Sequence, residues 1–140
     1  MKRNATAVWN GTGKDGNGKL DTQSGVLKGS QFSYKTRFED GIGTNPEELI
    51  AAAHAGCFSM KLSFNISAEG ITPDEINTKA DVNLNPEKGE IDVIHLTVKV
   101  KAAGLSKDKF DELVADAKEN CPVSKVLKGA AITLDAELLG

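Results

Sequence analysis

The sequence is poor in several residue types and patterns, and each shortage excludes a class of protein. Among its 140 residues are only two cysteines, too few for the disulfide framework of a small secreted domain. It has no run of about 18 apolar residues, so we expect no membrane-spanning helix. The first residues carry charge without an apolar stretch behind them, so we also expect no secretory leader. These absences favour a cytoplasmic protein without a membrane partner.

Positive charge is also in short supply. Lys and Arg number 17 against 20 Asp and Glu, which gives a net charge of −3. A chain without excess positive charge cannot follow a phosphate backbone, so nucleic acid is not expected as a partner. Apolar residues make up 39%, a share typical of a soluble fold once the 14 glycines are added. The length suits one domain with its own core, and we predict a single domain over residues 1–140.

The first third of the chain favours β-structure. Short strands are expected at residues 5–9 and 19–23, on either side of a segment rich in glycine and asparagine. A third strand is expected from Val26 to Phe38, because its aromatic residues fall at alternate positions. On such a strand Arg37 faces the side opposite to Phe38.

The strongest helix signal follows a glycine-rich loop. Asn45 is a favourable N-cap, Pro46 suits the first helical position, and Glu48 completes a capping-box pattern. We predict a helix that runs to about Ala68 and is stopped by Gly70. Its apolar residues lie on most sides, which is typical of a helix inside a core. One chain of this length hardly covers such a helix, so a partner chain is the expected cover.

The rest of the chain contains both strand and helix patterns. Strands are expected at residues 78–84, 91–101 and 131–138. A helix should follow Ser106, and a short helical turn should follow Pro122. The predicted order is βββ-α-ββ-α-α-β, and strands joined by hairpins in this order are typical of an α+β fold with antiparallel sheets.

The two cysteines are the first candidates for chemistry, and each has a plain structural alternative. Cys57 lies in the middle of the long predicted helix, where a free thiol also serves as a small apolar core residue. Cys121 precedes Pro122 at a predicted helix start, where the helix dipole favours thiolate but a simple cap is equally compatible. The two thiols are far apart in sequence, so there is no CxxC redox motif.

Arginine and histidine supply the other candidates. Of the 17 basic residues, only Arg3 and Arg37 are arginines. The planar fork of Arg37 suits a bidentate carboxylate such as Glu47, and the alternative is two solvated charges beside a loop. His54, on the same helical side as Cys57, could act as a general base or, with both cysteines, as a zinc ligand. The ligand spacings of known zinc sites are absent, so no metal site is predicted.

Two segments resemble the signature motifs of the OsmC/Ohr family. They are GTNPEELIAAAHAGCFSM at residues 43–60 and NCPVS at residues 120–124. The TRF segment at residues 36–38, the chain length and the element order agree as well, so the resemblance covers essentially the whole chain and implies a single OsmC-like domain. The Ohr branch carries its active-site arginine in an earlier glycine-rich loop. Residues 10–18 hold no arginine, which leaves Arg37 as the only candidate and favours the branch of osmotically inducible protein C.

The resemblance implies a thiol-dependent peroxidase that needs no metal, haem or flavin. Such an enzyme reduces organic hydroperoxides, and hydrogen peroxide more weakly, to alcohols. By this resemblance Cys57 is the peroxidatic cysteine, Cys121 is the resolving cysteine, and Arg37 and Glu47 activate Cys57. The Cys57 thiolate becomes a sulfenic acid, and Cys121 condenses with it to a disulfide. An external dithiol, for which a lipoyl-type group is one option, reopens the bond.

The resemblance also bears on the substrate pocket and on assembly. Phe38, Phe58 and Met60 are candidates for a pocket that takes an alkyl tail, with plain core packing as the alternative. Glu47 and Cys57 are ten residues apart on one helix, which is roughly 15 Å along its axis. If both serve one site, either the helix breaks between them or the site uses two chains. Residues 49–56 contain no proline, and their only glycine adjoins Cys57, which favours two antiparallel helices from two chains. We therefore expect sheets wrapped around a long central helix in an intertwined homodimer with shared active sites.

Two functions of other classes stay open on the residues alone. The first is a non-enzymatic stress-response module that binds a partner and whose cysteines only pack. The second is a zinc-binding protein. Consumption of peroxide with a dithiol reductant separates the peroxidase from both.

Overall fold

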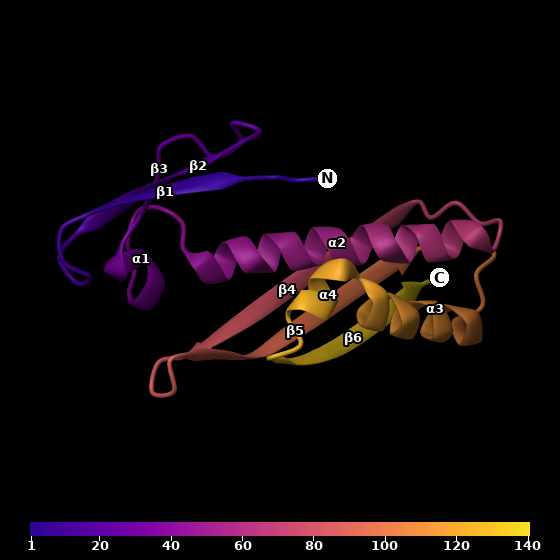
Figure 1. The fold of residues 1–140 in the computed structure, drawn as a ribbon. Coiled ribbons are helices and arrows are strands. Elements are labelled where there is room, and N and C mark those ends of the chain that lie inside the picture. Colours follow the sequence, from indigo (N-terminus) through magenta and orange to yellow (C-terminus); the bar gives the residue numbers. More distant parts are fainter. The chain divides into compact units, whose positions relative to one another are not determined.

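The computed structural model describes residues 1–140 and forms two compact units, residues 1–49 and 50–140. Figure 1 labels the elements of both units. The first unit contains β1 (Ala5–Asn10), β2 (Asn17–Thr22), β3 (Ser30–Phe32), α1 (Tyr34–Phe38) and the start of α2 (Pro46–Ala68). The second contains the rest of α2, β4 (Glu75–Asn85), β5 (Glu90–Lys101), α3 (Lys107–Asn120), α4 (Pro122–Val126) and β6 (Ala131–Leu139).

The predicted α+β class is confirmed, but the third predicted strand is wrong in its second half. Strand β3 ends at Phe32, and the chain then forms the short helix α1. Ser33 caps this helix through a reciprocal pair, in which each side-chain oxygen of Ser33 and Thr36 accepts the other residue's backbone N–H. Tyr34 and Phe38 stack at 4.8 Å. Residues four apart share a face in a helix as they do in a strand, so alternation alone could not separate the two.

The first unit has an antiparallel sheet in the order β1-β2-β3. Trp9 and Phe32 pack with ring centroids 5.3 Å apart. Gly18 lies against both rings, and a Cβ there would come within 2.4 Å of Phe32, so any larger residue would displace the ring. Every residue of β1 is exposed, and the unit contributes no buried hydrophobic residue to the core.

The second unit has a sheet in the order β4-β5-β6 that departs from the predicted antiparallel pairing. β4 and β5 form the expected antiparallel hairpin, whereas β5 and β6 are parallel. The chain reaches β6 through α3 and α4, and a crossover of this kind is what a parallel neighbour requires. The fold is therefore α+β with one mixed sheet and one antiparallel sheet.

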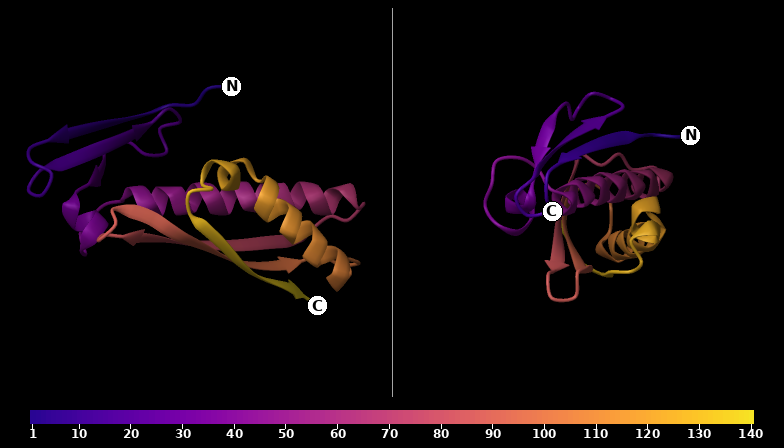
Figure 2. Two further views of the ribbon diagram at one scale, coloured as in Figure 1. Left: turned by 60° about the horizontal axis from the view of Figure 1, so that its bottom comes forward. Right: turned by 60° about the vertical axis from the view of Figure 1, so that its left-hand side comes forward.

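The hydrophobic core of the second unit lies between one face of this sheet and two helices. Figure 2 shows α2 and α3 on the same face, and Asn65 of α2 donates a hydrogen bond to the Leu113 carbonyl of α3 at 3.1 Å. Complete burial of a Val, Leu, Ile or Phe side chain contributes about 1.5–3 kcal/mol. The main residues of this kind in the core are Phe58, Leu62, Ile66, Ile94, Leu96, Val98, Val100, Phe110 and Val114.

Helix α2 has the predicted bounds and an unexpected start and burial pattern. Asn45 caps it by accepting the Glu48 N–H at 2.8 Å, but no reciprocal bond from the Glu48 side chain forms, so the predicted capping box is only half present. The residues buried along its core-facing stripe are His54, Phe58, Leu62 and Ile66. Met60 and Phe64 stay 64% and 68% exposed.

No helix of the chain is long and apolar enough to cross a bilayer.

Candidate active site

The second unit brings the two cysteines together. Cys57 lies near the middle of α2, and Cys121 occupies the junction between α3 and α4. The thiols of Cys57 and Cys121 share a hydrogen bond, and their two Sγ atoms are 2.6 Å apart. Both cysteines are free thiols. Formation of a disulfide bond of about 2.05 Å therefore needs only a small movement of either side chain.

The position of Cys121 follows from the sequence around it. Pro122 has no N–H and its ring obstructs continuation of α3, so the chain breaks there and starts α4. Cys121 is the C-cap of α3, where its N–H donates to the Ala117 carbonyl at 3.0 Å. It is also the N-cap of α4, where its carbonyl accepts the Lys125 N–H at 3.1 Å. Held from both sides, Cys121 is fully buried.

Cys57 carries a thiol that its surroundings keep protonated. Burial is the main cause that raises the pKa of Cys57, and the hydrogen bond that its thiol shares with Cys121 raises it further by favouring the protonated form. A hydrogen bond with the backbone of Val123 in α4 acts in the opposite direction and lowers the pKa of Cys57. Because the raising effects win, this thiol needs a cation from elsewhere to become a thiolate near neutral pH.

A mostly apolar hollow opens beside the Cys57 sulfur. Its lining is Cys57, Met60, Lys61, Phe64, Asn120 and Pro122. Met60 therefore lies where the sequence predicts a pocket residue. Phe58 points into the core with no exposed surface and does not line the hollow, so its role is the packing alternative. The reason is helical geometry, since Phe58 directly follows Cys57 and is turned about 100° from it.

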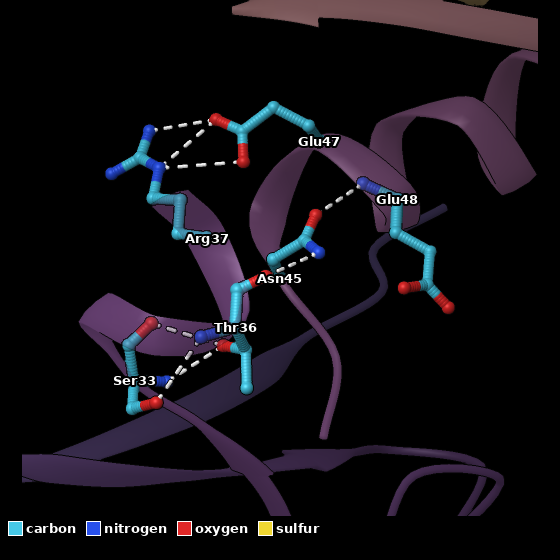
Figure 3. A network of polar contacts seen from close by, with 6 residues as sticks. All are labelled: Ser33, Thr36, Arg37, Asn45, Glu47 and Glu48. Carbon is cyan, nitrogen blue, oxygen red and sulfur yellow. Dashed lines mark hydrogen bonds and ion pairs between the residues drawn. The ribbon is translucent and has the colours of Figure 1, made fainter. Parts of the chain in front are cut away.

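The first unit holds the predicted arginine and carboxylate as a bidentate pair (Figure 3). Arg37 Nη2 donates to Glu47 Oε1 at 2.8 Å, and Arg37 Nε donates to Oε1 at 3.0 Å and to Oε2 at 3.3 Å. The Glu47 side chain is 10% exposed and that of Arg37 is 41% exposed. This fork-to-carboxylate geometry is the strong form of an ion pair. It leaves the outer edge of the guanidinium free for another group.

Short hydrogen bonds set the geometry of this pair. Asn45 donates from its amide to the Thr36 carbonyl of α1 at 2.8 Å and accepts the Glu48 N–H of α2 at 2.8 Å. It therefore ties together the two helices that carry Arg37 and Glu47 (Figure 3). Arg37 lies on the helix α1 and not on a strand, so the prediction that it lies on the strand face opposite to Phe38 is wrong. Phe38 lines a separate hollow of the first unit that includes Arg37, Trp9, Phe32 and Tyr34.

His54 does not bond to Cys57. Its Nε2 is 2.8 Å from Ser124 Oγ, and both residues are buried. Burial lowers the pKa of His54 and favours its neutral form. The structure contains no cluster of three or more His, Cys, Asp or Glu side chains placed to hold a metal ion.

Comparison with known proteins places the chain in a family. Residues 39–137 match the family model described as "OsmC-like protein". The chain is 45% identical over 140 residues to "Peroxiredoxin OsmC" of Escherichia coli, a match that covers 99% of this chain and 97% of that protein. The chain belongs to the OsmC family. The predicted resemblance is thereby confirmed.

Further OsmC family relatives extend this result. "Organic hydroperoxide resistance protein OhrB" of Bacillus subtilis is 33% identical over 115 residues, which cover 80% of this chain and 82% of that protein. A crystal structure of an organic hydroperoxide resistance protein OsmC from Legionella pneumophila superposes with a TM-score of 0.69 at 26% identity and covers 97% of both chains. The α+β fold is thus shared with this family.

Sequence reasoning missed two parts of the arrangement. It gave His54 no contact with Ser124, and it did not foresee the Val123 backbone at the Cys57 sulfur. Ser124 stands in the NCPVS motif three residues after Cys121, and His54 stands three residues before Cys57. This matched spacing was the available signal, but it gains meaning only once α2 and α4 are seen to pack together.

Proposed function

We propose that the protein is a peroxidase that reduces organic hydroperoxides through the thiols of Cys57 and Cys121. The observation that carries the proposal is the 2.6 Å separation of two sulfur atoms from distant parts of the sequence. A thiol pair beside an apolar hollow suits a peroxide with an alkyl tail better than it suits hydrogen peroxide, because the tail gains apolar contacts. The names of the OsmC and OhrB relatives, a peroxiredoxin and a hydroperoxide resistance protein, agree with this activity.

The reaction begins at Cys57, which faces the hollow while Cys121 is buried. The thiolate attacks the distal peroxide oxygen, the O–O bond breaks, and the leaving alkoxide takes a proton and departs as an alcohol. Cys57 is then a sulfenic acid. The Cys121 sulfur attacks it, a disulfide forms and water leaves. An external dithiol, of which a lipoyl-type group is one form, returns both thiols by exchange.

Arg37 and Glu47 are proposed to activate Cys57. Burial raises the pKa of Cys57, so a cation is required, and the only arginine besides Arg3 stands ready in a bidentate pair with Glu47. Glu47 fixes the guanidinium plane and leaves its outer edge for the thiolate or for a peroxide oxygen.

The proposed assembly is a homodimer in which Glu47 of one chain serves Cys57 of the partner. Helix α2 is continuous over both residues, which the rise of a helix separates by roughly 15 Å. Large apolar side chains also stay exposed in one chain, which favours a covering partner. They include Val8, Val26, Phe38, Ile42, Met60, Phe64 and Val126. A cytoplasmic location and a single domain over residues 1–140 remain predictions of the sequence.

A peroxide-consumption assay tests the proposed activity. Purified protein with dithiothreitol as reductant should consume tert-butyl hydroperoxide faster than hydrogen peroxide, and Cys57→Ser should lower the rate to that of reductant alone. Unchanged consumption by Cys57→Ser would favour a non-enzymatic module in which the cysteines only pack. Stoichiometric zinc in the purified wild-type protein that is absent when both cysteines are replaced by serine would favour the zinc-binding alternative.

A further inference from the structure

The feature that the proposed mechanism does not use is the buried polar pair of His54 and Ser124. His54 is completely buried in α2, and Ser124 is 3% exposed in α4. Their side chains meet at 2.8 Å between Nε2 and Oγ. The other hydrogen bond between these helices joins the Cys57 thiol to the backbone of Val123. The His54–Ser124 pair is the only link between α4 and α2 that is made by two side chains.

This pair and the thiol pair are two successive links between the same two segments. His54 precedes Cys57 by three residues, and Ser124 follows Cys121 by three. Along the two segments, the first link joins His54 to Ser124 and the second joins Cys57 to Cys121. The segments thus run antiparallel, with the two links about one helical turn apart. A shift of α4 that breaks the first link moves the second.

Packing stability does not explain why the pair is polar. The other buried residues of this stripe of α2, Phe58, Leu62 and Ile66, are all apolar, and His54 is its only polar member. His54 Nδ1 is buried and has no hydrogen-bond partner among the protein atoms. A buried polar atom left unpaired destabilises a fold by about 1–3 kcal/mol, whereas an apolar side chain of similar size would carry no such penalty. Polar groups kept against stability in this way point to a functional site.

We propose that His54 and Ser124 are positioning residues that hold Cys121 against Cys57, so that the sulfenic acid on Cys57 is resolved before a second peroxide reaches it. This inference rests on the proposed peroxidase function. Two reactions compete for the sulfenic acid. Cys121 converts it to a disulfide with loss of water, and a second hydroperoxide oxidises it to sulfinic acid with release of an alcohol. The hydrogen bond favours the first reaction by keeping the two sulfur atoms close.

The test measures how the sulfenic acid divides between these two products. Each protein is treated with increasing tert-butyl hydroperoxide, without reductant, and the disulfide and sulfinic forms of Cys57 are quantified by mass spectrometry. Ser124→Ala and His54→Leu remove the hydrogen bond by different routes. Each should raise the ratio of sulfinic acid to disulfide three- to tenfold, the effect of losing about one hydrogen bond. The rate of the first oxidation of Cys57 is followed separately by stopped flow. Both products form from the same sulfenic acid, so their ratio does not depend on that rate.

Two further variants separate positioning from general loosening of α2. His54→Gln keeps a nitrogen within reach of Ser124 and should restore most of the wild-type ratio. Ser59→Ala is the matched control, because Ser59 of α2 hydrogen bonds through its hydroxyl to Thr78 of β4 at 2.7 Å rather than to α4. It should leave the ratio unchanged, and melting temperatures of all variants show which remain folded.

The outcomes distinguish this inference from the function on which it rests. If wild type forms neither disulfide nor oxidised Cys57, the peroxidase proposal itself fails. If wild type forms the disulfide and folded Ser124→Ala and His54→Leu match its ratio, only the positioning role fails. A change of equal size in Ser59→Ala overturns it as well, because the effect would then belong to α2 as a whole.

Discussion

The two units of the chain hold their functional groups in opposite ways. In the second unit the thiols lie on a core of packed apolar side chains, and Cys121 is fully buried. In the first unit the Arg37–Glu47 pair is held by a few hydrogen bonds between α1 and the start of α2, and this unit contains no buried hydrophobic residue. A nucleophile that must meet a resolving thiol needs rigid packing. A charge pair gains its geometry from its own fork and carboxylate, so it tolerates a thinner support.

The same comparison shows why neither unit suffices for the proposed chemistry. The surroundings of Cys57 raise its pKa, and the only cation lining its hollow is Lys61. Lys61 already lies 3.7 Å from Asp116, whose pKa is lowered mainly by a hydrogen bond from Asn65. The bidentate guanidinium belongs to the first unit. Substitutions in the two units should therefore have very different effects on activity.

The largest effect is expected from Arg37→Lys. The charge is kept, but lysine cannot hold Glu47 with two parallel donors, so the cation loses its fixed direction. We expect kcat/KM for an organic hydroperoxide to fall about 10²–10³-fold, the usual result of losing one charged contact in the transition state. Arg3→Lys is the matched control and should have no effect, because Arg3 is exposed and bonds only to the neighbouring Lys2 carbonyl. An Arg37→Lys enzyme with most of its kcat/KM would contradict the assigned role.

Complementation tests whether the two roles come from different chains. Glu47→Ala and Cys57→Ser chains, refolded together, form heterodimers with one intact composite site. Such heterodimers should recover roughly half of the wild-type activity, because one of the two sites of a two-fold dimer is restored. Verified heterodimers without activity, or a monomer by light scattering, would contradict the shared site.

A small effect is expected from Lys61→Gln. Lys61 is partly exposed and engaged by Asp116, and such surface pairs contribute little. We expect kcat/KM to change by less than about threefold. A fall comparable to that of Arg37→Lys would show that the second unit supplies its own cation.

The smallest effect is a pH-dependent change in stability due to His54. Burial lowers the pKa of His54, so below about pH 6.5 the unfolded chain binds a proton that the folded chain resists. The contribution of His54 to the free energy of unfolding is therefore fully present above about pH 6.5 and falls as the pH drops toward 5. Urea unfolding at pH 7.5 and 5 should show a larger loss for wild type than for His54→Gln, since the carboxylates titrate in both. Equal losses would contradict a buried neutral His54.

The sequence predicts most of the fold and only part of the site. Helix α2 is predicted well because Asn45, Pro46 and Gly70 mark its ends independently of packing. Helix α1 is missed because the spacing of Tyr34 and Phe38 fits the period of a strand as well as that of a helix. Its N-terminal signal is also unusual, since Thr36 takes the place of the glutamate or glutamine that completes a typical capping box after Ser33. The parallel pairing of β6 is also missed, since alternation carries no strand direction.

For the site, the division between prediction and surprise is physical as well. Arg37 and Glu47 are predictable as a pair because guanidinium and carboxylate chemistry selects its partner locally. The contact of His54 with Ser124 depends on how α4 packs on α2, and no local pattern encodes that packing.

The central claim is that Cys57 and Cys121 work as one redox pair, and thiol titration tests it most directly. One equivalent of tert-butyl hydroperoxide is added to reduced wild-type protein, and free thiols are counted under denaturing conditions. We predict the loss of both thiols together, with a peptide that links Cys57 to Cys121 within one chain and both thiols recovered by dithiothreitol. Loss of Cys57 alone as sulfinic acid, with Cys121 still free, would contradict the account.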